Sequence, residues 1–302
     1  MRLRSELTAL SLLLASCGGA TPAPTATATA AAPPRPRHAI LVDRPEHAGQ
    51  RWRVRATGRE TEANEIIIGD GDHGSREVEA RVIEMSAVVT ILEVDAEGRQ
   101  LRLRYDIESL TLMADEQRAD LVPAGGAITI IRGEEPVIDL DGQPLDPALQ
   151  DQLDLVMELG VDQSDDDVFG SSVPRAVGDE WTLDGERARR ALAETGIAVG
   201  QVTGRMRVQD EVDVDGEPCL DLRGHMTLTG LELPPLPEGA RAESAGMHML
   251  FEGLYPLDLT HHERSERSKL TTTVDVRMGP TRLRSVQTRE VRRTFEPLPD
   301  AS

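Results

Sequence analysis

The sequence has little lysine and few aromatic residues. Its 302 residues include one lysine, Lys269, and aromatic residues make up 2% of the chain. A buried core must therefore be built from leucine, valine, isoleucine and methionine. The formal net charge is −20, from 53 acidic side chains against 33 lysines and arginines. This charge argues against binding to nucleic acid or to bare anionic lipid through net charge, because both need a positive field.

Long apolar runs are also missing. Residues 7–15 form an apolar stretch at the N-terminus, which is shorter than the roughly 20 residues that a membrane-spanning helix needs. No later segment is apolar enough to span a membrane. The stretch follows Arg2 and Arg4, and a short apolar run behind positive charges is typical of a secretory signal.

The chain has two cysteines, and one of them ends this apolar stretch. Leu14-Ala15-Ser16-Cys17 resembles the lipobox of bacterial lipoproteins. The resemblance implies that the Cys17 thiol receives a diacylglycerol, that residues 1–16 are cut off as a signal peptide, and that the new amino terminus is acylated. An ordinary signal peptide, or one with an incidental cysteine, would also fit. Gly18 follows the cysteine. In Gram-negative lipoproteins an Asp there favours the inner membrane, so the outer membrane, facing the periplasm, is expected.

Residues 17–37 are rich in alanine, threonine and proline. Such a composition cannot bury a core, and prolines keep it extended. We interpret this segment as a tether between the lipid bilayer and a folded domain at residues 38–302. Several acyl chains make a stable anchor, whereas one chain binds a membrane only marginally. The second cysteine, Cys219, then has no disulfide partner, and we expect it to be a small buried strand residue.

Alternation of apolar and polar residues dominates the domain. In residues 51–56, Trp52, Val54 and Ala56 fall on one face and three arginines on the other, which is typical of a half-buried strand. Residues 101–105 and 205–208 repeat the pattern, and residues 87–94 read as a central strand. Asp-Gly and related turns at residues 94–98 and 212–216 predict two hairpins. Further strands are expected near residues 245–259, 268–278 and 282–295.

Two helices are predicted between the strands. Asp146 caps the first, Pro147 occupies its first position and Gly160 ends it; its apolar stripe is Leu149, Leu153, Val156 and Met157. Asp184 caps the second, which covers residues 186–195. The expected fold is mainly β (α+β): a large curved antiparallel sheet or open half-barrel with one or two helices packed on it. The two hairpins are alike, so two similar halves, about residues 48–160 and 174–295, are a further possibility.

One motif stands before the second hairpin region, Pro174-Arg175-Ala176-Val177-Gly178-Asp179-Glu180-Trp181. It resembles the P-x-x-x-V-G-D-x-W signature of a family of uncharacterised bacterial lipoproteins, with one residue fewer between proline and valine. The resemblance implies a fold and a cellular address, but no catalytic residues. More remotely, a curved sheet with helices on it resembles the half-barrels of lipoprotein carriers and receptors, which bind acyl chains in the concave face.

No motif for catalysis or for a cofactor is found. Acidic glycine loops at residues 69–74, 139–142 and 213–216 lack the closing glutamate of a calcium loop, so we read Asp and Gly there as turn formers. Residues 165–167 read as a solvated acidic loop. His261 and His262 are expected on one strand, where neighbours point to opposite faces and cannot easily share a metal. His225 and His248 read as ordinary strand residues. We therefore expect no metal and no cofactor.

Arginines gather near the C-terminus of this acidic chain. They balance acidic neighbours on a solvent-facing strand pair, or they form a docking patch for an anionic partner or a lipid headgroup; the residues concerned are Arg277, Arg282, Arg284, Arg289, Arg292 and Arg293.

Together these features predict a non-enzymatic, membrane-anchored periplasmic lipoprotein that binds an apolar ligand or an envelope protein on a concave sheet. The alternatives are a structural or assembly scaffold without a ligand pocket and, less favoured, a hydrolase with a carboxylate site.

Overall fold

The fold is described from a computed structural model. It covers residues 35–68, 74–115, 117–133, 136–157, 159, 165–194 and 196–300, which belong to one compact unit that begins at Arg35. Cys17, the signal peptide, most of the tether and the loop at residues 69–73 lie outside the described residues.

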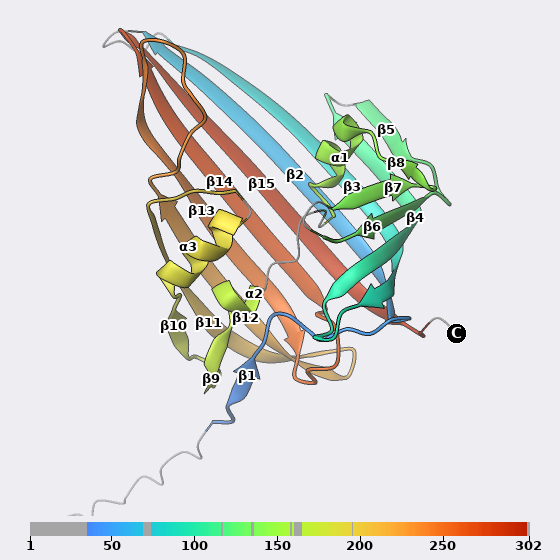
Figure 1. The fold of residues 1–302 in the computed structure, drawn as a ribbon. Helices are drawn as coiled ribbons and strands as arrows, with labels where there is room; N and C mark the ends of the chain where they lie inside the picture. Colours follow the sequence, from blue (N-terminus) through green and yellow to red (C-terminus); the bar gives the residue numbers. More distant parts are fainter. Residues whose placement is uncertain are drawn as a thin grey trace, which may run out of the picture. The chain divides into compact units, whose positions relative to one another are not determined.

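A single antiparallel sheet of thirteen strands dominates this unit, and it does not close on itself (Figure 1). One part of the sheet is formed by the first half of the chain: β2 (Arg51–Ile68), β3 (Gly74–Val94), β4 (Gln100–Ala114), β5 (Gln117–Val122), β6 (Ala127–Ile131), β7 (Val137–Leu140) and β8 (Gln143–Pro144). The other part contains β10 (Glu180–Thr182), β11 (Gln201–Val214), β12 (Glu217–Thr229), β13 (Ala240–Pro256), β14 (Ser265–Met278) and β15 (Thr281–Leu298).

The two parts join where β15 pairs with β2 along the full length of both strands. The strand order is β10-β11-β12-β13-β14-β15-β2-β3-β4-β6-β7-β8, with β5 paired to β4. A separate two-stranded sheet pairs β1 (His38–Ile40) with β9 (Ser171–Arg175). The expected mainly β fold, with a large antiparallel sheet that stays open, is confirmed.

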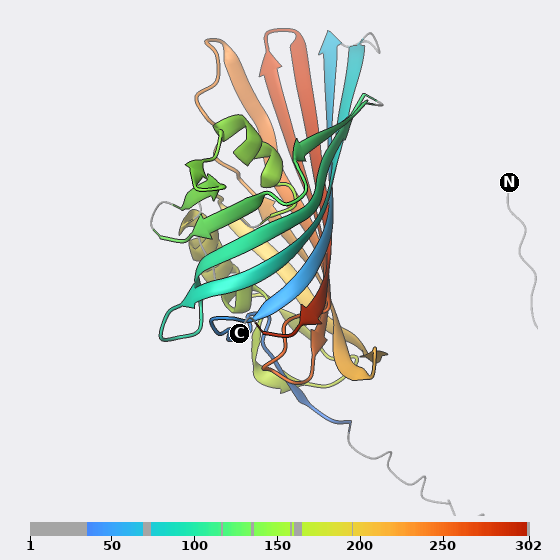
Figure 2. The same cartoon turned by 90° about the vertical axis from the view of Figure 1, so that its right-hand side faces the viewer.

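Three helical segments, α1 (Pro147–Leu153), α2 (Asp165–Val168) and α3 (Gly185–Glu194), lie on the same side of the sheet. We call this side the inner face and the opposite side the outer face. Figure 2 shows β3 and β4 curving toward the helices. None of the helices among the described residues is both long and apolar enough to span a membrane.

Both predicted hairpins are present. The β11–β12 turn is made by Asp215 and Gly216, with φ of 54° and 86°, the left-handed conformations that tight hairpins need. In the β3–β4 turn, Asp95 Oδ1 accepts hydrogen bonds from the backbone N–H groups of Glu97 and Arg99, each 2.9 Å long. These bonds to the charged form lower the pKa of Asp95.

The first predicted helix is shorter than expected. Asp146 caps it as predicted, since its Oδ1 accepts from Ala148 N at 2.8 Å, but the helix ends at Leu153 and not at Gly160. After Leu153 the backbone hydrogen bonds span three residues instead of four: Leu155 N donates to Gln152 O, and Val156 N donates to Leu153 O. The physical reason is that Leu155, outside the predicted stripe, is also fully buried and must face the sheet. For α3, Asp184 Oδ1 accepts from Glu186 N and Arg187 N, as its predicted capping role requires.

Candidate functional site

Two hydrophobic clusters lie on the inner face. The first contains Trp52, Val54 and Ile83 and is covered by the segment after α1; the second contains Met206, Leu222 and Phe251 and is covered by α3. The strand register from β12 to β2 places both on one side of the sheet, because paired residues share a face and the side chains of the cluster positions alternate with those of the other face. The clusters are therefore neighbours on one surface.

A polar strip from β14, β15 and β2 separates the two clusters. Glu60 is 9% exposed and contacts Arg81, Gln287 (2.7 Å) and Arg289 (3.5 Å). Arg293 pairs with Glu266 at 3.2 Å and donates to Val156 O at 3.3 Å. Because buried charges must be paired to be tolerated, these contacts hold the strip together.

Apolar side chains emerge again on the inner face at the far end of the strands. Ile66 of β2 pairs with Leu283 of β15, and each is 39% exposed. Ile68 and Met278 lie next to them, nearer the strand ends, and are 60% and 52% exposed. Figure 1 shows these strand ends extending beyond the helices. We call Ile66, Ile68, Met278 and Leu283 the distal apolar row; it is the most exposed apolar part of the inner face among the described residues.

At the opposite end of the sheet, His262 is held in an aromatic setting. Its ring stacks on Trp52 at 4.3 Å and meets the edge of Phe295 at 4.7 Å between centroids. Its Nδ1 lies 3.1 Å from a Glu263 carboxylate oxygen and 3.6 Å from one of Glu46. A cavity of about 310 Å³ and a smaller one of about 50 Å³ share the wall formed by Trp52, His262, Glu263 and Phe295.

The two adjacent histidines occupy positions that differ from the prediction. They lie in the loop between β13 and β14, not on a strand, because β13 ends at Pro256, whose ring removes the backbone donor that pairing needs. His261 contacts Glu217, away from the partners of His262. His225 and His248 lie on β12 and β13 as expected. Within the described ranges, no cluster of three or more His, Cys, Asp or Glu side chains suited to a metal is found.

The acidic glycine loops that can be described are turns. Asp139 Oδ1 accepts from Gly142 N at 3.0 Å, and Asp213 Oδ1 accepts from Gly216 N at 2.8 Å. Asp165 begins the short helix α2 rather than an irregular loop. Cys219 is buried on β12, and burial raises the pKa of its thiol.

The C-terminal arginines are distributed over both faces of the sheet. Register on β15 places Arg289 and Arg293 on the inner face and Arg282, Arg284 and Arg292 on the outer face. Most of them are ion-paired: Arg277 with Glu243, Arg282 with Asp275 and Glu243, Arg289 with Glu60 and Asp154, Arg292 with Glu290, and Arg293 with Glu266. The arginines of the expected docking patch therefore do not form one continuous surface, and a partner role for them stays a prediction.

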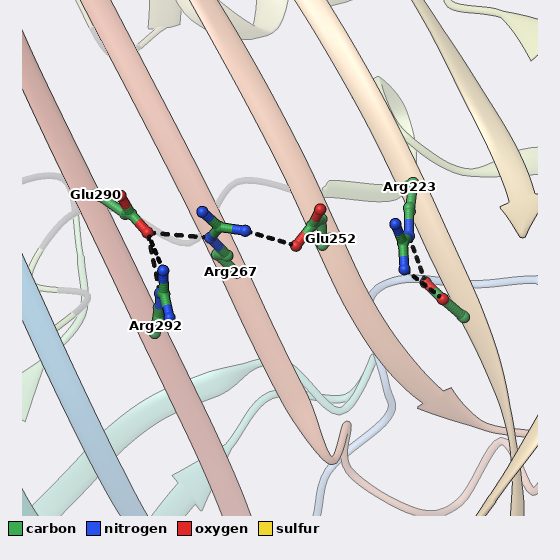
Figure 3. A network of polar contacts seen from close by, with 6 residues as sticks. Arg223, Glu252, Arg267, Glu290 and Arg292 are labelled. Carbon is green, nitrogen blue, oxygen red and sulfur yellow. Dashed lines mark hydrogen bonds and ion pairs between the residues drawn. The ribbon is translucent and has the colours of Figure 1, made fainter.

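On the outer face, charged side chains form a ladder across the strands (Figure 3). Arg267 donates to Glu252 at 3.1 Å and to Glu290 at 3.0 Å, and Glu290 accepts from Arg292 at 2.8 Å. The hydrogen bond from Arg292 is the main cause that lowers the pKa of Glu290. Such cross-strand pairs of opposite charge stabilise a sheet.

The Val-Gly-Asp-x-Trp motif forms the turn that leads into β10. Gly178 has φ of 90°, and Asp179 Oδ2 accepts from Ala176 N at 3.0 Å. Val177 packs against the second hydrophobic cluster, and Trp181 belongs to it. Val177 and Trp181 therefore both have a packing role in the second cluster.

Comparison with protein-family models gave no match for this chain, and comparison with curated protein sequences gave none.

The sequence did not point to the surroundings of His262 or to the distal apolar row. Both depend on residues far apart in the chain, such as Trp52 and Phe295, or Ile66 and Leu283. The one local signal for the His262 surroundings was Glu263, the acidic residue directly after the two histidines.

Proposed function

We propose that this chain is a lipid-anchored protein of the bacterial cell envelope, held in the outer membrane through Cys17 and facing the periplasm. We further propose that it binds an apolar ligand, or an apolar segment of an envelope protein, on the inner face of its open sheet. The observation that carries the binding proposal is the distal apolar row, because large apolar side chains such as Ile68 are exposed there, on the face that carries both hydrophobic clusters. Exposed apolar surface of this kind commonly marks an interaction site.

The position of the row favours an extended ligand over a small compact one. Ile66, Leu283 and Val276 lie side by side on β2, β15 and β14, and the surface is open toward the strand ends. An acyl chain or an apolar peptide segment would cover several rows at once. The polar strip at Glu60 and Arg289 then limits how far an apolar group extends along the inner face.

The anchor is tested by replacing the lipidated residue. Cys17→Ser, expressed in a bacterium that labels lipoproteins with palmitate, should lose the lipid label and move from the membrane to the soluble fraction. A variant that still carries label and fractionates with membranes would refute the anchor. The control is Cys219→Ser, which should keep both properties.

The binding face is tested with a fluorescent fatty acid, dansylaminoundecanoic acid. Ile66→Ser with Leu283→Ser should weaken its binding about 5–30-fold, because two partly buried contacts contribute about 1–2 kcal/mol. The matched control is Val78→Ser with Leu250→Ser, which changes residues of similar exposure, 53% and 42%, on the outer face. Equal losses in both double variants, or a parent chain that binds neither the fatty acid nor an apolar peptide, would refute an apolar site on the inner face. An apolar peptide in place of the fatty acid distinguishes the two kinds of ligand.

A further inference from the structure

The distal apolar row is part of a larger apolar area on the inner face. Register places further apolar side chains of β13 and β14 on the same face, beside the row; they are Ala240, Ala242, Ala245, Met247, Val274 and Val276. The area covers neighbouring positions on β13, β14, β15 and β2, and adjacent strands lie about 4.8 Å apart, so it is about 15 Å wide. An α-helix with its side chains is about 10–12 Å in diameter, so the area can seat one helix.

The charged side chains that the strands contribute to this part of the inner face are all negative. Arg81, Glu60 and Arg289 form one cross-strand row on β3, β2 and β15. Between this row and the distal ends, the described inner-face positions of β13, β14, β15, β2 and β3 include no lysine or arginine. They include three carboxylates, Glu62, Glu77 and Glu79. The apolar area is therefore bordered by uncompensated negative charge on its β2–β3 side.

Glu77 and Glu79 are open to a partner. β4 ends at Ala114, opposite Arg81, so no described strand pairs with that edge of β3 further toward its distal end. Both glutamates are exposed, and neither pairs with a cation in the part of the chain that the structure describes. A bound partner can therefore supply the positive charge that these two carboxylates lack.

The apolar area and its acidic border together favour a ligand that is apolar on one side and basic beside it. Opposite charges across an interface favour encounter and fix its register, whereas like charges disfavour association. A fatty acid would bring further negative charge to this border. The two glutamates are two residues apart on one strand, so their Cα atoms are separated by about 6.6 Å. Two basic residues four apart on a helix are separated by about 6 Å along its axis, which allows each to face one carboxylate.

We propose that the distal part of the inner face binds a basic amphipathic helix of an envelope protein. The apolar stripe of this helix packs on the distal apolar row, and its basic flank pairs with Glu77 and Glu79. This inference rests on the proposed function, an apolar site on the inner face, and names its ligand as a positively charged polypeptide segment.

The test compares three fluorescent peptides that differ only in charge. The first has the helix-forming sequence LKKLLKLLKKLLKL, and glutamine or glutamate replaces every lysine in the second and third. Fluorescence anisotropy with the full chain carrying Cys17→Ser should give the tightest binding for the lysine peptide and the weakest for the glutamate peptide. Glu77→Gln with Glu79→Gln should weaken binding of the lysine peptide about 3–10-fold, the effect of two exposed ion pairs. The same double variant should bind the glutamine peptide as the parent does, and the loss should shrink in high salt.

A matched variant controls for the net charge of the whole protein. Glu84→Gln with Glu93→Gln makes the same change of charge on the same strand, with Glu84 on the outer face opposite Thr57 and Glu93 at the other end of β3. It should weaken binding of the lysine peptide less than about twofold, because salt screens distant exposed charges.

The outcomes separate this inference from the proposed function. The inference alone is overturned if the three peptides bind equally, if only the fatty acid binds, or if both charge variants lose the same affinity, while Ile66→Ser with Leu283→Ser still weakens binding. Both are overturned if the parent chain binds none of the peptides and no fatty acid, or if Ile66→Ser with Leu283→Ser leaves all binding unchanged.

Discussion

Replacing Gly58 by alanine should loosen the attachment of the segment after α1 to the sheet. Gly58 lies on the inner face of β2, and a Cβ atom built there would be 2.5 Å from both Leu155 Cγ and Leu155 O. Ordinary contacts between carbon atoms are about 3.5–4.0 Å, so Leu155 would have to move by about 1 Å. Leu155 is fully buried, which leaves no free space for this movement.

The expected magnitude follows from two opposing effects. Overpacking of a well-packed core costs about 1–3 kcal/mol. Replacing glycine in an extended strand reduces the entropy of the unfolded chain, which stabilises by about 0.4–1 kcal/mol. We therefore expect Gly58→Ala to lower the free energy of unfolding by about 1–2 kcal/mol, measured by urea unfolding with tryptophan fluorescence.

A double-mutant cycle with Leu155→Ala separates the two contacts. Leu155→Ala removes the clashing side chain but keeps the carbonyl oxygen, so the two changes together should cost less than their sum, with a coupling of about 0.5–3 kcal/mol. The control is Thr57→Val, because Thr57 is an exposed neighbour on the outer face and such changes usually stay within about 0.5 kcal/mol. If Gly58→Ala is as mild as Thr57→Val, the close packing of Leu155 on β2 is refuted.

Two further predictions concern charge. Burial raises the pKa of Asp166, so the folded state binds its proton more tightly than the unfolded state, and the resulting stabilisation is present in acid and lost as the pH rises through the folded pKa. Asp166→Asn, which keeps an oxygen for Val42 N, should therefore gain stability relative to the parent between about pH 4 and 7; a difference in urea midpoint that does not change with pH would contradict this. Arg267→Gln, which removes the ion pairs to Glu252 and Glu290 at a side chain that is 40% exposed, should cost less than about 1 kcal/mol, and the cost should shrink in high salt. A loss above 2 kcal/mol that salt does not reduce would show that the ladder is more than a surface network.

Local signals in the sequence were sufficient for parts of the long strands and for two hairpin turns, but the short strands β1 and β5 to β10 were not predicted. The turn at Asp215 and Gly216 was predictable because both residues adopt positive φ easily, and the alternation of Trp52, Val54 and Ala56 predicted the buried face of β2. The early end of α1 was not predictable, since it depends on Leu155 meeting Gly58, a contact between segments that have no sequence signal in common.

The candidate sites were harder to predict for the same reason. The pairing of β2 with β15 brings Ile66 to Leu283 and Trp52 near Phe295, and no local pattern specifies which strands become neighbours. Alternation also implies that Arg289 and Arg292 point to opposite faces, so a single patch of C-terminal arginines was a weaker expectation than its charge suggested.

The last strand among the described residues, β15, lies in the middle of the sheet. Because β15 pairs with β2 from Leu298 opposite Arg51 to Thr281 opposite Ile68, the two parts of the sheet are joined only when residues 281–298 are available. Pairing between such distant segments is slow. If the chain is exported from its amino terminus, β2 keeps one edge unpaired until residues 281–298 have crossed, and loss of β15 would divide the sheet near its centre instead of removing an edge strand.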